Sequence, residues 1–130
     1  MKEIDDFLRT NRPEVKDDPT FLLETYRRMD QVEGIKAEVI DIRTLFPLDK
    51  DIIRESLEKT NKVIIITEET KRGGYGGEIS ATIGEEMFDL LDAPIARIGS
   101  LDTPVPFAPN LEQYYMPNER DIVVAAKKMF

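Results

Sequence analysis

The 130-residue chain contains no cysteine and no histidine. Without cysteine it has no disulfide, no thiolate nucleophile and no thiolate zinc ligand. Without histidine it lacks the usual general base and the commonest ligand of transition metals. Much of ordinary enzyme chemistry is therefore excluded before any motif is considered.

Basic residues and long apolar runs are also scarce. The chain has 18 Lys and Arg against 26 Asp and Glu, and a net charge of -8 would repel a phosphate backbone, so nucleic acid is not expected as a partner. The longest apolar run, VIIIT at 63–67, is far shorter than the roughly 20 residues of a membrane-spanning helix. The opening MKEIDDFL does not resemble a signal peptide. We expect a cytoplasmic protein with no membrane partner.

The sequence divides into two regions. Residues 1–19 are highly charged, contain two prolines and carry only a short helical spacing of apolar residues, so we interpret them as an N-terminal helical extension and linker. Residues 20–130 are interpreted as one α/β domain, which opens with a helix that begins near Pro19 and ends at Gly34. A chain of this length buries roughly two thirds of its unfolded surface, which is enough for an ordinary core.

Strand and helix patterns alternate through this domain. The strands are predicted at 37–42, 62–67 and 94–100, and the helices at 49–60, 79–90 and 118–129. Residues 62–67 are apolar on both faces, which is typical of a central parallel strand covered by helices on both sides. The alternation favours the α/β class, with three α/β/α layers around a largely parallel sheet.

A glycine-rich loop, TKRGGYGGEIS at 70–80, lies between a predicted strand and a predicted helix. Free amides at such a helix start can hold an anion. The glycines of this possible anion loop are Gly74, Gly76 and Gly77. The two basic residues before them favour an anion, but Glu78 would repel a phosphate, and Ile79 stands where a dinucleotide fingerprint has its third glycine. An anion site and a structural turn both remain open.

A second unusual segment, LDTPVPFAPNLEQYYMP at 101–117, contains four prolines and three aromatic residues. Prolines at this density stiffen an extended chain, and the aromatic rings would hold it on a surface. Either the segment wraps around its own domain or its apolar side chains form a contact with another chain. The candidate docking residues in it are Phe107, Tyr114 and Tyr115.

Four segments together resemble a known family. GIKAEVIDIRTLFPLD, KTNKVIIITEE, GGYGGEISATI and FDLLDAPIARIGSLDTPVPFAPNLEQYYMP are similar, in order and spacing, to the C-terminal domain of the β subunit of thiamine-diphosphate-dependent 2-oxo acid dehydrogenases. This is the transketolase C-terminal domain family, and the resemblance covers about Gly34 to Phe130. It implies a non-catalytic assembly and docking domain. The parent enzyme, a pyruvate or branched-chain 2-oxoisovalerate dehydrogenase, would oxidatively decarboxylate a 2-oxo acid and acylate lipoyl groups.

The resemblance also implies where the cofactors lie. In this family thiamine diphosphate and magnesium sit between a pyrophosphate-binding and a pyrimidine-binding domain, and this sequence carries neither of them nor a Gly-Asp-Gly cofactor motif. We therefore predict no catalytic, cofactor-binding or metal-binding residue in this chain, and no activity of the chain alone. The alternative is a regulatory α/β domain that binds a small anion at the glycine loop.

The resemblance implies three kinds of partner: the missing domains or an α subunit, a second β-subunit copy in a dimer, and the lipoyl acyltransferase core, whose small binding domain is basic. In such relatives the end of the β subunit is a docking place for that domain, so Phe130 is a further candidate docking residue, unless it is an ordinary solvated terminus. The family's domain normally begins with a strand similar to VTIVTYG, which has no counterpart here. We expect an open sheet edge unless the extension or another copy covers it.

Overall fold

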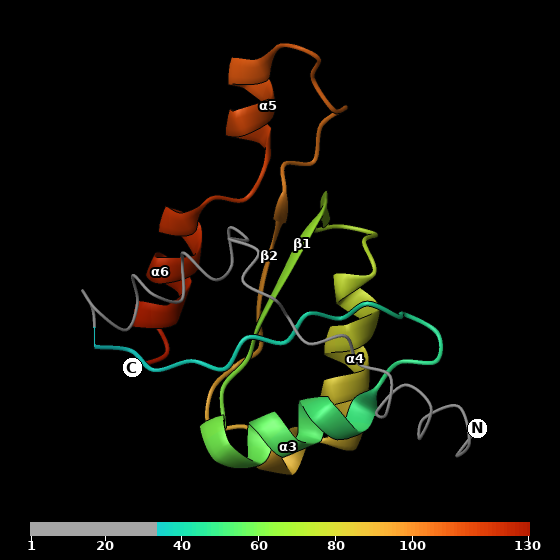
Figure 1. Cartoon of the computed structure of the whole chain (residues 1–130), viewed down its shortest axis with the longest axis vertical. Coiled ribbons are helices and arrows are strands. Elements are labelled where there is room, and N and C mark those ends of the chain that lie inside the picture. Colours follow the sequence, from blue (N-terminus) through green and yellow to red (C-terminus); the bar gives the residue numbers. More distant parts are fainter. Residues whose placement is uncertain (1–33) are drawn as a thin grey trace.

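The computed structural model describes residues 34–130, in which a small parallel sheet lies between two layers of helices (Figure 1). The elements are α3 (Lys50–Thr60), β1 (Ile64–Thr70), α4 (Gly76–Glu86), the 3-10 helix η1 (Phe88–Leu90), β2 (Ala96–Ser100), α5 (Pro109–Tyr115) and α6 (Glu119–Lys127). No helix in this part of the chain is long and apolar enough to cross a membrane. The predicted extension, the helix from Pro19 and the place of the family's first strand lie outside the described residues.

Strands β1 and β2 run parallel, with Ile64 opposite Ala96, and their register shifts beyond Ile66. Neighbouring side chains on a strand point to opposite faces of the sheet. Ile65 accordingly packs with α3 and α4, whereas Ile64 and Ile66 contact α6. Helices cover the isoleucine run from both sides, so the predicted three-layer arrangement around a parallel strand is confirmed.

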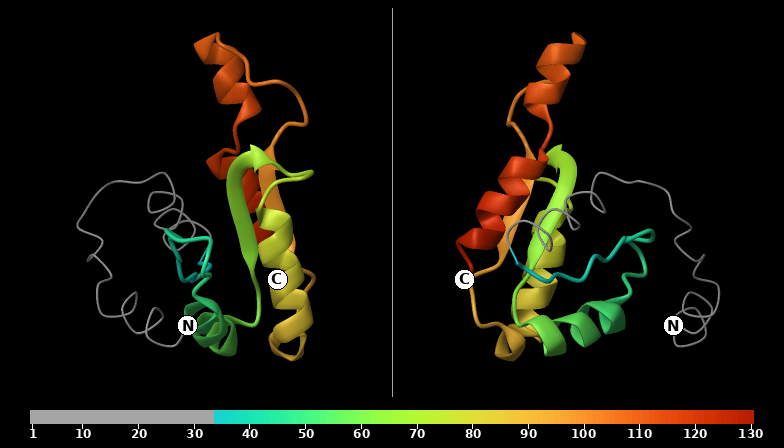
Figure 2. Two further views of the ribbon diagram at one scale, coloured as in Figure 1. Left: turned by 90° about the vertical axis from the view of Figure 1, so that its right-hand side faces the viewer. Right: turned by 60° about the vertical axis from the view of Figure 1, so that its left-hand side comes forward.

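Two hydrophobic clusters form the core, one on each face of the sheet, and Figure 2 shows α4 and α6 on the two opposite sides of the strands. The first consists of Ile53, Leu57, Ile65, Ile79, Ile83 and Met87, and the second of Ile122, Val123 and Ala126. The side chain of Ile83 is only 1% exposed. Full burial of one such side chain contributes about 1.5–3 kcal/mol, so these apolar stripes determine how α3, α4 and α6 lie on the sheet.

Local capping signals place the helix starts. The side chain of Asp49 accepts a hydrogen bond from the backbone N–H of Ile52 at 3.2 Å, and Leu48 packs against the first cluster. Asn118 and Asp121 form a reciprocal capping box at the start of α6, with both distances at 3.2 Å. Each contact satisfies an amide that has no partner within its helix. The predicted starts of both helices are confirmed.

Residues 37–42, predicted as a strand, are not part of the sheet. They cross over the body as a separate segment (Figure 1), and Glu38 is held to α3 by an ion pair with Lys59 at 3.1 Å. Alternating apolar residues favour extended backbone, but a strand also requires a neighbouring edge for its hydrogen bonds. Here a cavity separates the segment from β1, and the prediction of a third paired strand was wrong for this part of the chain.

The proline-rich segment 101–117 was predicted to be extended but contains the helix α5. Pro109 occupies the first helical turn. Backbone N–H groups in this turn have no acceptor within the helix, so the missing N–H of proline costs no helical hydrogen bond. No further proline occurs before Pro117, so nothing interrupts the helix. All three views show α5 standing away from the sheet and its covering helices (Figures 1 and 2). We call residues 101–117 the α5 arm.

Candidate functional site

The glycine loop connects the end of β1 with the first turn of α4. Gly73 takes φ +75°, in the left-handed region that suits glycine. Gly76 is buried against the sheet, and a Cβ there would lie 3.1 Å from Cγ2 of Thr67. The small residue lets α4 approach β1 closely, which is the architectural role expected of a structural turn.

The first turn of α4 already has a carboxylate of its own. The backbone N–H of Tyr75 donates a hydrogen bond to Oε2 of Glu69 at 2.6 Å. Glu78 adds a second acidic side chain in this turn, at the positive end of the helix dipole. An external phosphate at Gly74, Gly76 or Gly77 would have to compete with these internal charges, so the geometry favours the turn over the anion site.

Two arginines near the loop are engaged within the chain. Nε of Arg72 lies 3.3 Å from Oδ2 of Asp102, and the guanidinium of Arg97 donates to the carbonyl oxygen of Lys71 at 3.2 Å. The first contact holds the loop to the residues after β2, and the second holds it to β2 itself. Sequence reasoning missed Arg97, because its contact joins β2 to the residue after β1, 26 positions away along the chain, and no local motif encodes it.

The predicted docking residues of the α5 arm differ in exposure. Phe107 is fully exposed and Tyr114 is 78% exposed, whereas Tyr115 is only 8% exposed. The carbonyl oxygen of Tyr115 accepts a hydrogen bond from the backbone N–H of Leu101 at 3.2 Å, which closes the base of the arm. Tyr115 therefore supports the arm from inside, and its ring is not a surface anchor in this conformation.

Phe130 lies apart from the arm, beyond the other end of α6 (Figure 1). Its ring is exposed, and Nζ of Lys62 lies 4.6 Å from the ring centroid. This is the geometry of a cation–π contact. The four residues predicted for docking thus occupy three places: the outside of the arm, its base, and the far end of the last helix.

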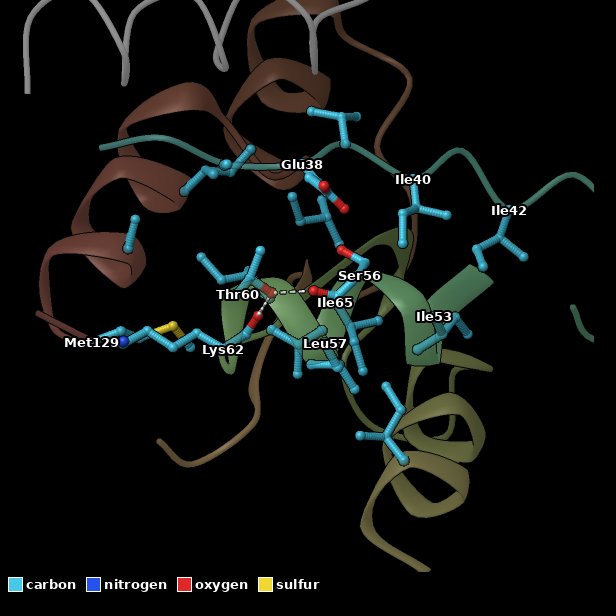
Figure 3. Close-up of a pocket in the computed structure, with 18 of the residues that line it drawn as sticks. Glu38, Ile40, Ile42, Ile53, Ser56, Leu57, Thr60, Lys62, Ile65 and Met129 are labelled. Atoms are coloured by element: carbon cyan, nitrogen blue, oxygen red, sulfur yellow. Dashed lines mark hydrogen bonds between the residues drawn. The ribbon is translucent and has the colours of Figure 1, made fainter. Parts of the chain in front are cut away.

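A cavity of about 720 Å³, which no sequence pattern predicted, lies between residues 35–42 and the body of the domain (Figure 3). Most of its wall is aliphatic, and polar groups such as Ser56 and Lys59 of α3 lie among the lining residues. A hydrogen bond with Ser56, together with one from Lys59, lowers the pKa of Glu38 from its usual value. This segment is thereby fixed across α3 as one wall of the cavity.

Comparisons with known proteins place this geometry in context. Residues 23–122 match the protein family described as "Transketolase, C-terminal domain". The chain is 46% identical over 99 residues to "Pyruvate dehydrogenase E1 component subunit beta" of Rickettsia felis, a match that covers 76% of this chain and 30% of the relative.

Two proteins of Bacillus subtilis are also similar. The chain is 41% identical over 110 residues to "2-oxoisovalerate dehydrogenase subunit beta", which covers 84% of this chain and 33% of the relative. It is 53% identical over 90 residues to "Acetoin:2,6-dichlorophenolindophenol oxidoreductase subunit beta", which covers 69% of this chain and 26% of the relative. The matched part thus spans about a quarter to a third of each relative's length.

Proposed function

The chain belongs to the transketolase C-terminal domain family, and from this premise we propose that it is a non-catalytic assembly and docking domain. The parent would be the decarboxylating component of a 2-oxo acid dehydrogenase, in which this chain belongs to the β subunit. The observation that carries the proposal is the similarity to β subunits of pyruvate and 2-oxoisovalerate dehydrogenases over 76% and 84% of the chain. In the proposal the parent oxidatively decarboxylates a 2-oxo acid and acylates lipoyl groups.

The cofactors belong, in this proposal, to other domains of the parent enzyme. Residues 34–130 hold no group of three or more His, Cys, Asp or Glu side chains that would suit a metal ion. The glycine loop places the carboxylate of Glu69 at the helix amide, where a diphosphate would need a positive environment. The described residues therefore do not fit thiamine diphosphate, and we derive no chemical step for this chain.

The α5 arm is the surface we assign to assembly. Its exposed large apolar side chains are Leu101, Val105, Phe107, Leu111 and Tyr114. Several such side chains on one projecting segment are typical of a surface that is covered in a complex. Aromatic side chains also supply much of the binding energy in protein interfaces. The proposed partners are the α subunit, a second β-subunit copy, and the lipoyl acyltransferase.

The charge of the chain supports the last of these partners. A net charge of -8 suits a basic binding domain, because complementary charge accelerates association and disfavours wrong partners. Phe130, which is exposed beside Lys62, is the second docking point in this proposal. It lies far enough from the arm (Figure 1) that the two surfaces serve different contacts.

A matched pair of variants tests the arm. The double variant Phe107→Ser/Tyr114→Ser removes two exposed rings from the arm, and Phe88→Ser removes a ring that is 74% exposed on η1. Each variant is titrated with a purified α subunit and with the binding domain of a lipoyl acyltransferase. We expect the arm variant to bind at least one of them about tenfold more weakly or worse, the usual loss at an interface hot spot, and the η1 variant to bind both normally. Normal binding of both partners by the arm variant would refute the assignment.

A further inference from the structure

The α5 arm is fixed at its base and exposed along its length. At the base Tyr115 is 8% exposed, and Nε of Arg72 lies 3.3 Å from Oδ2 of Asp102. Beyond the base, Phe107 is fully exposed and Tyr114 is 78% exposed. This part of the arm stands away from both helix layers (Figures 1 and 2). The arm is therefore a projection with most of its apolar surface uncovered.

The exposed apolar side chains of α5 continue its buried one around the helix. Side chains three and four positions apart lie on the same face of a helix, so Leu111 lies between Tyr114 and Tyr115 on that face. Leu111 is 54% exposed. An apolar stripe of this width normally packs against another element, but only the Tyr115 edge does so here. Among residues 34–130, the side with Leu111 and Tyr114 has no such neighbour and is free to dock on another molecule.

The arm is poor in charge. Asp102 and Glu112 are its only charged residues, in a chain of which 34% of the residues are charged. Depletion of charge together with enrichment of aromatic residues is the compositional signal of the buried centre of a protein interface. Asp102 is already paired with Arg72, whereas Glu112 has no ion pair within residues 34–130. Glu112 is thus the one unpaired charge on an otherwise apolar and neutral surface.

This carboxylate decides which surface can cover the stripe. Glu112 follows Leu111 directly, so a surface that buries Leu111 also removes water from Glu112. A charge that loses its water needs an opposite charge nearby. Arm-to-arm pairing with a second copy offers none, because the arm contains no Lys or Arg, and it would bring two Glu112 carboxylates together. The covering surface must therefore supply the cation.

We propose, on the basis of the assembly role proposed above, that α5 enters an apolar groove with a Lys or Arg at its rim, on a protein other than this chain. Leu111 and Tyr114 are the anchors in the groove, and Glu112 meets the cation. A projection that also exposes Phe107, ahead of the helix, fits a concave surface better than a flat one. Docking of the apolar face of a helix in a groove is a recurrent mode of recognition.

A first pair of variants tests the anchor. The 130-residue chain is titrated with a purified α subunit and with the binding domain of a lipoyl acyltransferase. Leu111→Ala shortens the anchor, and Val124→Ala shortens an aliphatic side chain that is 43% exposed on α6. We expect Leu111→Ala to weaken binding of one of these partners about tenfold and Val124→Ala to change it less than about twofold. Unchanged urea midpoints show that both variants are folded.

A second pair tests the cation. Glu112→Gln and Glu58→Gln each remove one negative charge, the first on the arm and the second at an exposed position of α3. At an ionic strength of about 0.1 M, where charges act over about 10 Å, the first should weaken binding about threefold and the second less than about twofold. At about 1 M the difference between them should shrink, because the screening length falls to about 3 Å.

The results separate the groove from the assembly role of the arm. Normal binding of both partners by Phe107→Ser/Tyr114→Ser would remove the role itself. Weaker binding by that variant, together with equal effects of Glu112→Gln and Glu58→Gln at every ionic strength, would keep the role and refute the cationic groove. Light scattering that shows a dimer of the chain, dissociated by Leu111→Ala, would assign the arm to a second copy and refute the groove as well.

Discussion

Gly99, on β2, lies close against the backbone at the end of β1. A Cβ at this position would lie 2.8 Å from the carbonyl oxygen of Glu69 and 2.8 Å from the backbone N of Lys71. The position lies at the end of the ladder, where the register of β1 and β2 shifts. Because both neighbouring atoms belong to the main chain, they cannot rotate away as a flexible side chain would. The substitution Gly99→Ala must therefore move β1 and β2 apart at this end.

The magnitude follows from the packing. Forcing one extra methyl group into a closely packed site costs about 1–3 kcal/mol. Gly84→Ala is the matched control, because Gly84 lies within α4 and a Cβ there meets no atom within 4 Å. Alanine is favoured over glycine inside a helix by about 1 kcal/mol. The same chemical change should therefore lower the free energy of unfolding at Gly99 and raise it at Gly84, a difference of about 2–4 kcal/mol.

Urea unfolding of both variants, followed by circular dichroism at 222 nm, measures these free energies. The denaturant slope should remain that of the unsubstituted chain, since neither change alters the surface exposed on unfolding. A Gly99→Ala variant whose stability lies within about 0.5 kcal/mol of the parent, the usual range of a neutral surface substitution, would refute the close approach of β1 and β2.

Two further predictions concern the helix cap and an ion pair. Asn118→Ala breaks the capping box of α6 and should lower the free energy of unfolding by about 1 kcal/mol in the same urea assay; an unchanged midpoint would show that the cap does not hold the helix start. The pKa of Glu38 is lowered in the folded chain from its usual 4.5 by Ser56 and Lys59. Its contribution to stability is therefore present above pH 4.5 and lost as the pH falls through the lower folded-state pKa. Glu38→Gln should flatten this part of the stability profile with a small effect at neutral pH, and an unaltered profile would contradict the pairing.

The parts of the fold that depend on local chemistry were predictable. Asp49 and Asn118 cap helices through residues three positions away, so the sequence itself contains the whole interaction. The run at 62–67 is apolar on both faces, and this is sufficient to predict a strand covered by two helix layers. Its pairing with β2 follows from the βαβ order, because such crossovers connect parallel strands.

The parts that depend on distant contacts were not predictable. Residues 37–42 have the alternation of a strand, yet the neighbour that would pair with them is not beside them. Tyr114 and Tyr115 are adjacent in sequence, and only the return of the α5 arm to the body makes one exposed and the other buried. The sequence of the glycine loop is compatible with an anion site, and only the structure shows that the carboxylate of Glu69 accepts the hydrogen bond of the Tyr75 amide. The high proline content of the arm likewise predicted an extended segment, whereas Pro109 stands at the start of the helix α5.

We propose that this chain binds proteins of a 2-oxo acid dehydrogenase and does not bind thiamine diphosphate. Isothermal titration calorimetry of the 130-residue chain tests this most directly, with the basic binding domain of a lipoyl acyltransferase in one titration and thiamine diphosphate with magnesium in the other. We predict saturable binding of the protein domain that weakens as ionic strength rises above about 0.15 M, and no magnesium-dependent heat with the cofactor. Tight, magnesium-dependent binding of thiamine diphosphate, or the absence of any binding to the protein domain, would contradict the claim.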